Sequence, residues 1–152
     1  MANSFVLVTH AEFAQGIVSS LRLVLGDANS AAVVSVTTSE TVDAIAKRIC
    51  QAIDSLSSLG PVVVMTDIPG GSTTQATVQV APRRPDAYYV VGLNLGLLLE
   101  VALLPLGGSA HRESDLALIR NAVEASKKGI GVLTDLVGDV AGGSEDLESG
   151  EL

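Results

Sequence analysis

Short apolar runs alternate with helical patterns over the first hundred residues of the chain. The runs lie at residues 5–10, 31–36, 61–66 and 88–92, and between them apolar side chains recur every three or four positions. Strands separated by helices usually pair in parallel, and helices then cover both faces of the sheet. The sequence therefore predicts an α/β fold. We expect one doubly wound, mainly parallel sheet with the strand order 2-1-3-4 and helices on both faces.

The length and composition of the chain fit a single domain with a substantial core. Apolar residues make up 47% of its 152 residues and aromatic residues only 3%, as is typical of parallel strands packed by aliphatic helices. The most hydrophobic stretch, residues 88–106, contains Asn94 and Glu100 and is broken near its end by Pro105. We interpret it as a strand over 88–92 followed by a buried helix over 95–104, and not as a membrane span.

The charge and the cysteine content narrow the possible partners and location. A formal net charge of -8 argues against nucleic-acid binding, which needs basic patches, and favours a basic protein partner. Cys50 is the only cysteine and cannot form an internal disulfide. The N-terminus lacks the basic region and cleavage pattern of a signal peptide, so we expect a cytoplasmic location.

Three helix starts are suggested by hydroxyl residues. Thr37 and Glu40 have the spacing of a capping box before a helix that ends near Gly60. Ser72 begins a shorter helix that runs towards residue 80, and Ser114 is placed to cap a later helix that Gly129 ends.

The C-terminal part is expected to contain one more strand and a tail. Residues 130–136 form an apolar run, which we interpret as a late edge strand that could be exchanged within a dimer. From residue 138 onward there are five acidic residues and no basic one, among Gly and Ser. The expected organisation is thus one domain over 1–137 and an acidic, disordered tail over 138–152.

Two polar residues stand at the ends of neighbouring strands in the expected sheet. His10 ends the first apolar run, and Asp67 directly follows the third. In a sheet of order 2-1-3-4, the first and third strands lie side by side where the order reverses, and ligands bind at the carboxyl ends of strands there. We therefore expect His10 and Asp67 to face each other. The N–H groups at a strand-to-helix corner also favour an anion such as a phosphoryl group.

Three segments together resemble a known family. Residues 6–16 (VLVTHAEFAQG), 66–72 (TDIPGGS) and 92–100 (GLNLGLLLE) resemble the mannose-type IIA domain of the bacterial sugar phosphotransferase system, and the likeness extends over residues 4–136. It differs at Ala11, where the family usually has Gly, and at Thr73, where it often has Pro.

The resemblance implies a role in phosphoryl transfer. It implies a small α/β domain, commonly a homodimer, that takes a phosphoryl group from the protein HPr onto His10. The group then passes to a IIB protein, and through it the domain serves the membrane IIC and IID subunits of sugar uptake. Since the chain stops soon after the last expected strand, we expect the IIB protein to be separate.

The chemistry of His10 and Asp67 agrees with this role. A histidine near neutral pH keeps an unprotonated nitrogen that can accept a phosphoryl group. A carboxylate can hold the other ring N–H and stabilise the cation that forms. We hypothesise that His10 attacks through Nε2 while Asp67 supports Nδ1; the resemblance is the basis for assigning the two nitrogens.

The oxygens of the transferred group need hydrogen-bond donors. The expected donors are the N–H groups after Gly70 and Gly71 and the hydroxyls of Ser72 and Thr66. We expect no metal and no cofactor, because the donor is another phosphoprotein, and the second histidine, His111, has no Cys or His near it in sequence.

Each of these residues also has a structural interpretation, and three other classes of protein remain open. A lone histidine is often structural, and Asp before Gly-Gly often forms a turn. The first alternative is the phosphotransfer subunit of a dihydroxyacetone kinase, which uses the same histidine chemistry. The second is a response-regulator receiver, which would need an acidic pair where this chain has Thr9 and His10. The third is a non-catalytic regulatory module, which would carry no phosphate on His10.

Overall fold

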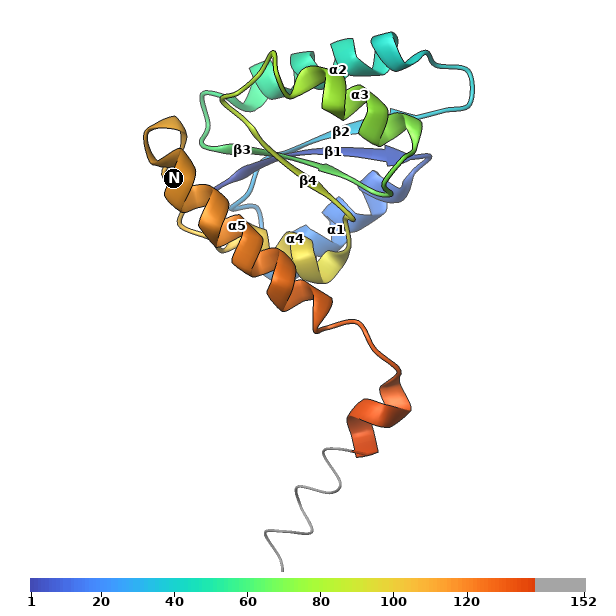
Figure 1. Cartoon of the computed structure of the whole chain (residues 1–152), viewed down its shortest axis with the longest axis vertical. Coiled ribbons are helices and arrows are strands. Elements are labelled where there is room, and N and C mark those ends of the chain that lie inside the picture. Colours follow the sequence, from blue (N-terminus) through green and yellow to red (C-terminus); the bar gives the residue numbers. More distant parts are fainter. Residues whose placement is uncertain (139–152) are drawn as a thin grey trace, which may run out of the picture.

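The computed structural model describes residues 1–138, and its centre is a parallel sheet of four strands. The strand order is β2-β1-β3-β4, which confirms the predicted order and the α/β class. Figure 1 shows the four strands in the middle of the molecule; they are β1 (Ser4–His10), β2 (Ala31–Val36), β3 (Val62–Thr66) and β4 (Tyr88–Val91).

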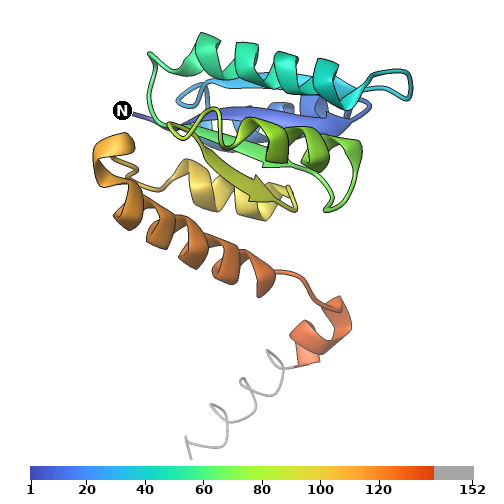
Figure 2. The same ribbon diagram turned by 45° about the horizontal axis from the view of Figure 1, so that its top comes forward.

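Five α-helices cover the two faces of this sheet. On one face lie α2 (Val42–Leu56) and α3 (Ser72–Val80), and on the other lie α1 (Phe13–Leu25), α4 (Leu95–Ala102) and α5 (Arg112–Lys127). Figure 2 shows the same layers, with α5 packed against the outer side of α4. A short 3-10 helix, η1, spans Ser109–His111.

The core has two halves because side chains alternate along β1. Phe5 and Leu7 are fully buried against α1 and α4, whereas Val6 and Val8 are fully buried on the face covered by α2 and α3. Burial on both faces is why residues 5–8 of β1 are all apolar, and His10, at the end of the strand, is its one exposed residue.

The register brings the ends of β1 and β3 together. Val8 pairs with Thr66 on β3, and His10 pairs with Val36 on β2. The residue after Thr66 therefore leaves the sheet beside His10, at the point where the strand order reverses.

The predicted late edge strand over 130–136 is wrong. Residues 133–138 are helical, and no strand follows β4 in the part of the chain that the structure describes. Its backbone bonds are local, since the N–H groups of Asp135 and Leu136 both donate to the carbonyl of Val132. A strand needs a neighbour with which to pair, and this segment leaves the domain (Figure 1). The tail predicted from residue 138 lies, except for Gly138, outside the described residues.

Two of the predicted helix starts also differ. Thr41, and not Thr37, caps α2, because its Oγ1 accepts the N–H of Ala44 at 3.2 Å. Glu40 instead accepts the N–H of Thr37, which closes the loop before the helix. The helix that Ser114 was expected to cap, α5, begins at Arg112, two residues before Ser114. The predicted helix from Ser72 to residue 80 is confirmed.

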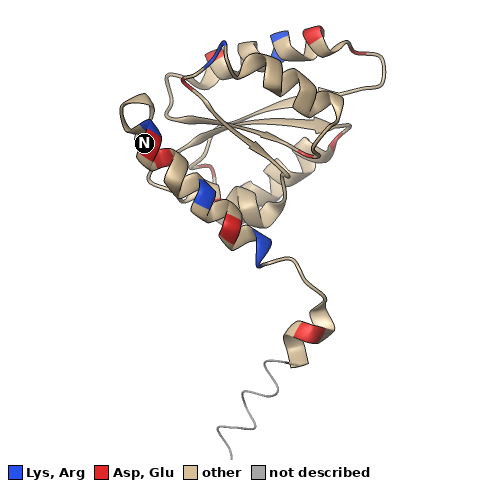
Figure 3. Cartoon of the chain, in the orientation of Figure 1, with Lys and Arg blue, Asp and Glu red and all other residues tan. Residues whose placement is uncertain are grey.

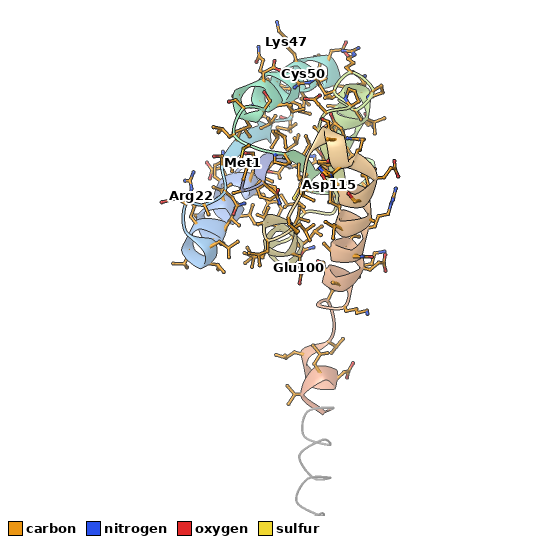
Figure 4. All side chains as sticks on the ribbon, turned by 90° about the vertical axis from the view of Figure 1, so that its left-hand side faces the viewer. Met1, Arg22, Lys47, Cys50, Glu100 and Asp115 are labelled. Atoms are coloured by element: carbon orange, nitrogen blue, oxygen red, sulfur yellow. The ribbon has the colours of Figure 1, made fainter. Side chains whose placement is uncertain are left out.

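A buried carboxylate attaches α5 to the sheet. Asp115 is only 2% exposed, and it accepts the hydroxyl of Tyr88 at 2.6 Å and the N–H groups of Gly107 and Gly108 at 3.0 and 2.8 Å. Figure 4 shows Asp115 on the side of α5 that faces the body of the domain. Burial raises the pKa of Asp115, but these hydrogen bonds outweigh burial and hold the pKa below its ordinary value.

Replacing this carboxylate is expected to destabilise the fold. Asp115→Asn removes the charge and turns an amide towards donors that need an acceptor, which should lower the free energy of unfolding by about 2–4 kcal/mol. Urea unfolding at pH 7 measures the loss. Glu113→Gln is the matched control, because Glu113 is exposed in the same helical turn. This substitution should lower the free energy of unfolding by less than about 0.5 kcal/mol.

The pH dependence of stability should distinguish the parent from Asp115→Asn. Because the pKa of Asp115 is lower in the folded chain, its contribution is fully present above the unfolded Asp pKa of about 3.9 and is lost as the pH falls through the folded value. Parent and Asp115→Asn should therefore converge in stability as the medium becomes acidic. If the free energies of unfolding of parent and Asp115→Asn differed by the same amount at pH 7 and at pH 3, this role of Asp115 would be contradicted.

Candidate functional site

A histidine–carboxylate pair lies at the carboxyl ends of β1 and β3. His10 Nδ1 is 2.7 Å from Asp67 Oδ2, and the same oxygen accepts the backbone N–H of His10 at 2.8 Å. The side chain of His10 is 45% exposed and that of Asp67 is 10% exposed. The structure thus brings together the two residues that the sequence placed at neighbouring strand ends, with the ring open to solvent and the carboxylate behind it.

Asp67 is held by donors on both of its oxygens. Its Oδ1 accepts the N–H of Ile68 and the hydroxyl of Thr73, each at 2.9 Å. Burial raises the pKa of Asp67, but the bonds from His10, Thr73 and Ile68 outweigh burial and hold the pKa below its ordinary value. Asp67 is therefore ionised at neutral pH and can only accept hydrogen bonds.

The ionised carboxylate assigns the tautomer of the histidine. Because Asp67 cannot donate, the Nδ1 of His10 must carry the proton that lies between them. In the neutral ring, Nε2 is then unprotonated and has a lone pair. The geometry therefore leaves the nucleophilic nitrogen on the side of the ring away from Asp67.

The corner between β1 and α1 holds this ring at the surface. Thr9 is fully buried, and its Oγ1 accepts the N–H of Ala14 at 2.9 Å, which satisfies the start of α1. Ala11 has a φ of +49°, a left-handed conformation that is uncommon for a residue with a side chain. This is the position at which the family usually has glycine, and the chain instead holds Ala11 in this strained turn, with the N–H of Ala11 donating to the carbonyl of Val36.

The Gly-Gly-Ser turn lies directly against the imidazole. Gly70 has a φ of +81°, which favours glycine, and a Cβ on Gly71 would lie 3.2 Å from Cε1 of His10. Within residues 1–138, the N–H groups of Gly71 and Ser72 donate to no other residue. Since Ser72 begins α3, these free donors and the helix dipole form a site suited to an anion beside His10.

An open hollow of about 530 Å³ lies in front of the ring. It is formed by the ends of β1 and β2, the loop after β2 and the first residue of α3, and its lining residues are His10, Ala11, Val36, Thr37, Thr38, Glu40 and Ser72. The side chain of His10 is 45% exposed at this hollow, so the ring is accessible to a group carried by another macromolecule.

The loops around this hollow are acidic. Residues 11–12, 37–41, 67–71 and 92–94 contain Glu12, Glu40 and Asp67 and no Lys or Arg; Figure 3 shows basic residues on α2, on α5 and in the loop before β4. Glu40 is paired with Arg48 at 2.6 Å. This distribution agrees with the expectation of a basic protein partner.

The structure does not bring the Thr66 hydroxyl to His10. Thr66 is 1% exposed, and its Oγ1 lies 2.9 Å from the hydroxyl of Thr74. It lines a separate, apolar hollow of about 190 Å³ between α3 and β4. The side chain of Thr66 is thus buried against α3, and Thr66 is not among the residues that line the hollow in front of His10.

Thr73 is the site residue that sequence reasoning missed. It is singled out there only as a departure from the family pattern, yet its buried hydroxyl donates to Asp67. The available signal was a hydroxyl in the first turn of the helix that follows the Asp67 loop, since such a residue can reach back over that turn.

Within residues 1–138, no group of three or more His, Cys, Asp or Glu side chains could hold a metal ion. His111 lies at the N-terminus of α5, beside Gly107. None of the described helices is long and apolar enough to cross a membrane.

The fold and the site define a class of protein: a small, doubly wound α/β domain with a histidine–carboxylate pair at the reversal of its strand order. A sequence model of the family described as "PTS system fructose IIA component", where PTS stands for phosphotransferase system, matches residues 4–111. The chain therefore belongs to this mannose-type family of phosphotransferase IIA components.

Solved structures of IIA proteins share the fold. The mannose/sorbose-specific IIA subunit of Enterococcus faecalis superposes with a TM-score of 0.70 at 22% identity, over 87% of this chain and 95% of that one. A IIA component from Streptococcus agalactiae gives 0.67 at 20% identity, over 88% and 98%. A IIA protein associated with a fucose utilization operon in Streptococcus pneumoniae gives 0.72 at 16% identity, over 89% and 96%.

Proposed function

We propose that this chain is a phosphocarrier that accepts a phosphoryl group from phospho-HPr on Nε2 of His10 and passes it to a separate IIB protein for sugar uptake through IIC and IID subunits. Membership of the IIA family indicates phosphoryl transfer, a transferase activity. The observation that carries the proposal is the 2.7 Å contact between Nδ1 of His10 and the Asp67 carboxylate, because it leaves Nε2 unprotonated and exposed.

The transfer uses one lone pair and needs no proton to move. The lone pair of Nε2 forms the new P–N bond while the bond between phosphorus and the donor breaks. Nδ1 keeps its proton, so the ring becomes a cation, and the ionised Asp67 stabilises that cation. Transfer to the next protein reverses these steps and returns the neutral ring.

The Gly-Gly-Ser turn supplies donors for the phosphoryl oxygens. The free N–H groups of Gly71 and Ser72, the Ser72 hydroxyl and the N-terminus of α3 lie beside the ring, where charge on the transferred group needs stabilisation. Gly70 contributes the conformation of the turn. The acidic loops around the hollow support a basic donor protein.

We also propose that the domain forms a homodimer through its C-terminal segment. Ile130, Val132, Leu133, Leu136 and Val137 are between 47% and 73% exposed, on a segment that leaves the domain (Figure 2). Clustered exposed apolar residues favour association. Sedimentation equilibrium should give twice the chain mass for the parent and the monomer mass for Leu133→Asp; a monomeric parent would contradict the dimer.

The proposed function is tested by reconstituting the relay. The parent protein is mixed with phosphoenolpyruvate, enzyme I and HPr, and the intact mass is followed before and after acid treatment. We expect an acid-labile phosphoryl group that moves on when a IIB protein is added. Transfer to a dihydroxyacetone kinase in place of IIB would assign the alternative branch. No label on the protein beside fully phosphorylated HPr would reject HPr as the donor.

A further inference from the structure

We infer that Thr73 is a positioning residue that holds the Asp67 carboxylate aligned with Nδ1 of His10, an inference that rests on the proposed role of His10 as the phosphoryl acceptor. The Thr73 hydroxyl is 2.9 Å from Asp67 Oδ1, and the residue is fully buried in the first turn of α3.

The direction of this hydrogen bond is determined by its acceptor. Ionised Asp67 can only accept, so the single hydroxyl proton of Thr73 points at Oδ1. Thr73 is held in place by its complete burial and by the first turn of α3, in which the N–H of Gln75 donates to the carbonyl of Gly71 at 2.9 Å. The helix therefore presents a rigid donor to the carboxylate.

Thr73 gives Oδ1 of Asp67 a donor from an element other than its own loop. Oδ2 receives the backbone N–H of His10, which belongs to β1, and the Nδ1–H of the ring, which is the group to be oriented. Oδ1 receives the N–H of Ile68, the next residue in the chain, which constrains the carboxylate only through the local turn. Thr73 is the donor to Oδ1 from a separate, packed element, α3, and together with the His10 backbone N–H on Oδ2 it resists rotation of the carboxylate about its own axis.

The consequence concerns the tautomer of the histidine. If the carboxylate turns away from Nδ1, the preference for the proton on Nδ1 weakens, and part of the population carries it on Nε2 instead. That population has no lone pair on the attacking nitrogen. Thr73 therefore raises the fraction of His10 that is ready to accept a phosphoryl group.

The test compares three variants at two positions of α3. Thr73→Val keeps the shape and removes the hydroxyl, Thr73→Ser keeps the hydroxyl, and Thr77→Val removes a buried hydroxyl that does not touch Asp67. One readout is the single-turnover rate of phosphoryl transfer from phospho-HPr. The other is the ¹⁵N chemical shift pair of the His10 ring in the unphosphorylated protein, which reports the tautomer without any transfer.

Thr73→Val should transfer on the order of tenfold more slowly, as expected for the loss of a hydrogen bond to a charged group, and its ring shifts should move towards a mixture of tautomers. Thr73→Ser should restore both readouts, and Thr77→Val should leave both at the parent values.

Parent-like ring shifts and rate in Thr73→Val would overturn the inference. Equal defects in Thr73→Val and Thr73→Ser, or in Thr77→Val, would show that packing of α3 and not the hydroxyl is responsible. Should the parent accept no phosphate at all, the proposed function fails, while the ¹⁵N comparison still decides whether Thr73 positions Asp67 towards the ring.

Discussion

A His10→Ala variant is expected to take up no acid-labile phosphate from phospho-HPr, whereas the parent protein becomes fully labelled. The imidazole is the group at the strand-order reversal with an exposed lone pair, and the turn donors of Gly71 and Ser72 lie against it. Removing the ring removes the atom to which phosphorus bonds, so the loss should be complete and not a reduction in rate. Intact mass with and without acid treatment measures it.

His111→Ala is the matched control for this prediction. His111 lies near Gly107 and Asp115, at the end of the domain opposite the hollow, and the variant should be labelled like the parent. The side chain of His10 is 45% exposed, so its removal should leave the fold intact, which circular dichroism verifies. Undiminished labelling of His10→Ala would place the acceptor elsewhere and remove the proposed mechanism.

An Asp67→Asn variant is expected to transfer the phosphoryl group about 10²–10⁴-fold more slowly while His10 stays the acceptor. The substitution has two effects that act in the same direction. The amide can donate to Nδ1 and so favour the tautomer that has its proton on Nε2, and the neutral side chain no longer stabilises the cationic ring. Rapid-quench phosphorylation gives the rate, and the ¹⁵N shifts of His10 report the tautomer.

Glu12→Gln controls for the change of charge at this surface. Glu12 is exposed in the loop after β1, so its replacement alters the net charge near the hollow by the same amount without touching the ring. It should change transfer by a small factor that salt reduces. If Glu12→Gln and Asp67→Asn were slowed equally, the effect would arise from docking of the donor, and Asp67 would lose its proposed role.

The sheet order and the pairing of His10 with Asp67 were both predicted from one sequence pattern, the alternation of apolar runs with helices. Apolar runs separated by helices pair in parallel, and the polar residues that end two adjacent runs then meet at one edge. The contact of 2.7 Å follows from the register that pairs Val8 with Thr66. The roles of both residues remain predictions that the experiments above address.

The sequence misled where a local pattern had two interpretations. The apolar residues over 130–137 suit a strand or a short helix, and only the lack of a neighbouring strand decides for the helix over 133–138. Thr66 ends a strand, but the partner of its hydroxyl, Thr74, comes from α3, which only the folded chain places over that strand.

The sequence by itself determined the α/β class and the two strand ends at which His10 and Asp67 lie, because these depend on periodicity and chain order. The strand order 2-1-3-4 was predicted as one of the common doubly wound orders, and the structure confirmed it. Only the tertiary structure decided that Thr73 reaches Asp67 and that Asp115 is buried among Tyr88, Gly107 and Gly108. Sequence reasoning places hydroxyl and carboxylate residues of a helix on the surface, since burying them is costly. That cost is offset here by donors and acceptors that come from other segments of the chain, and only folding brings those segments together.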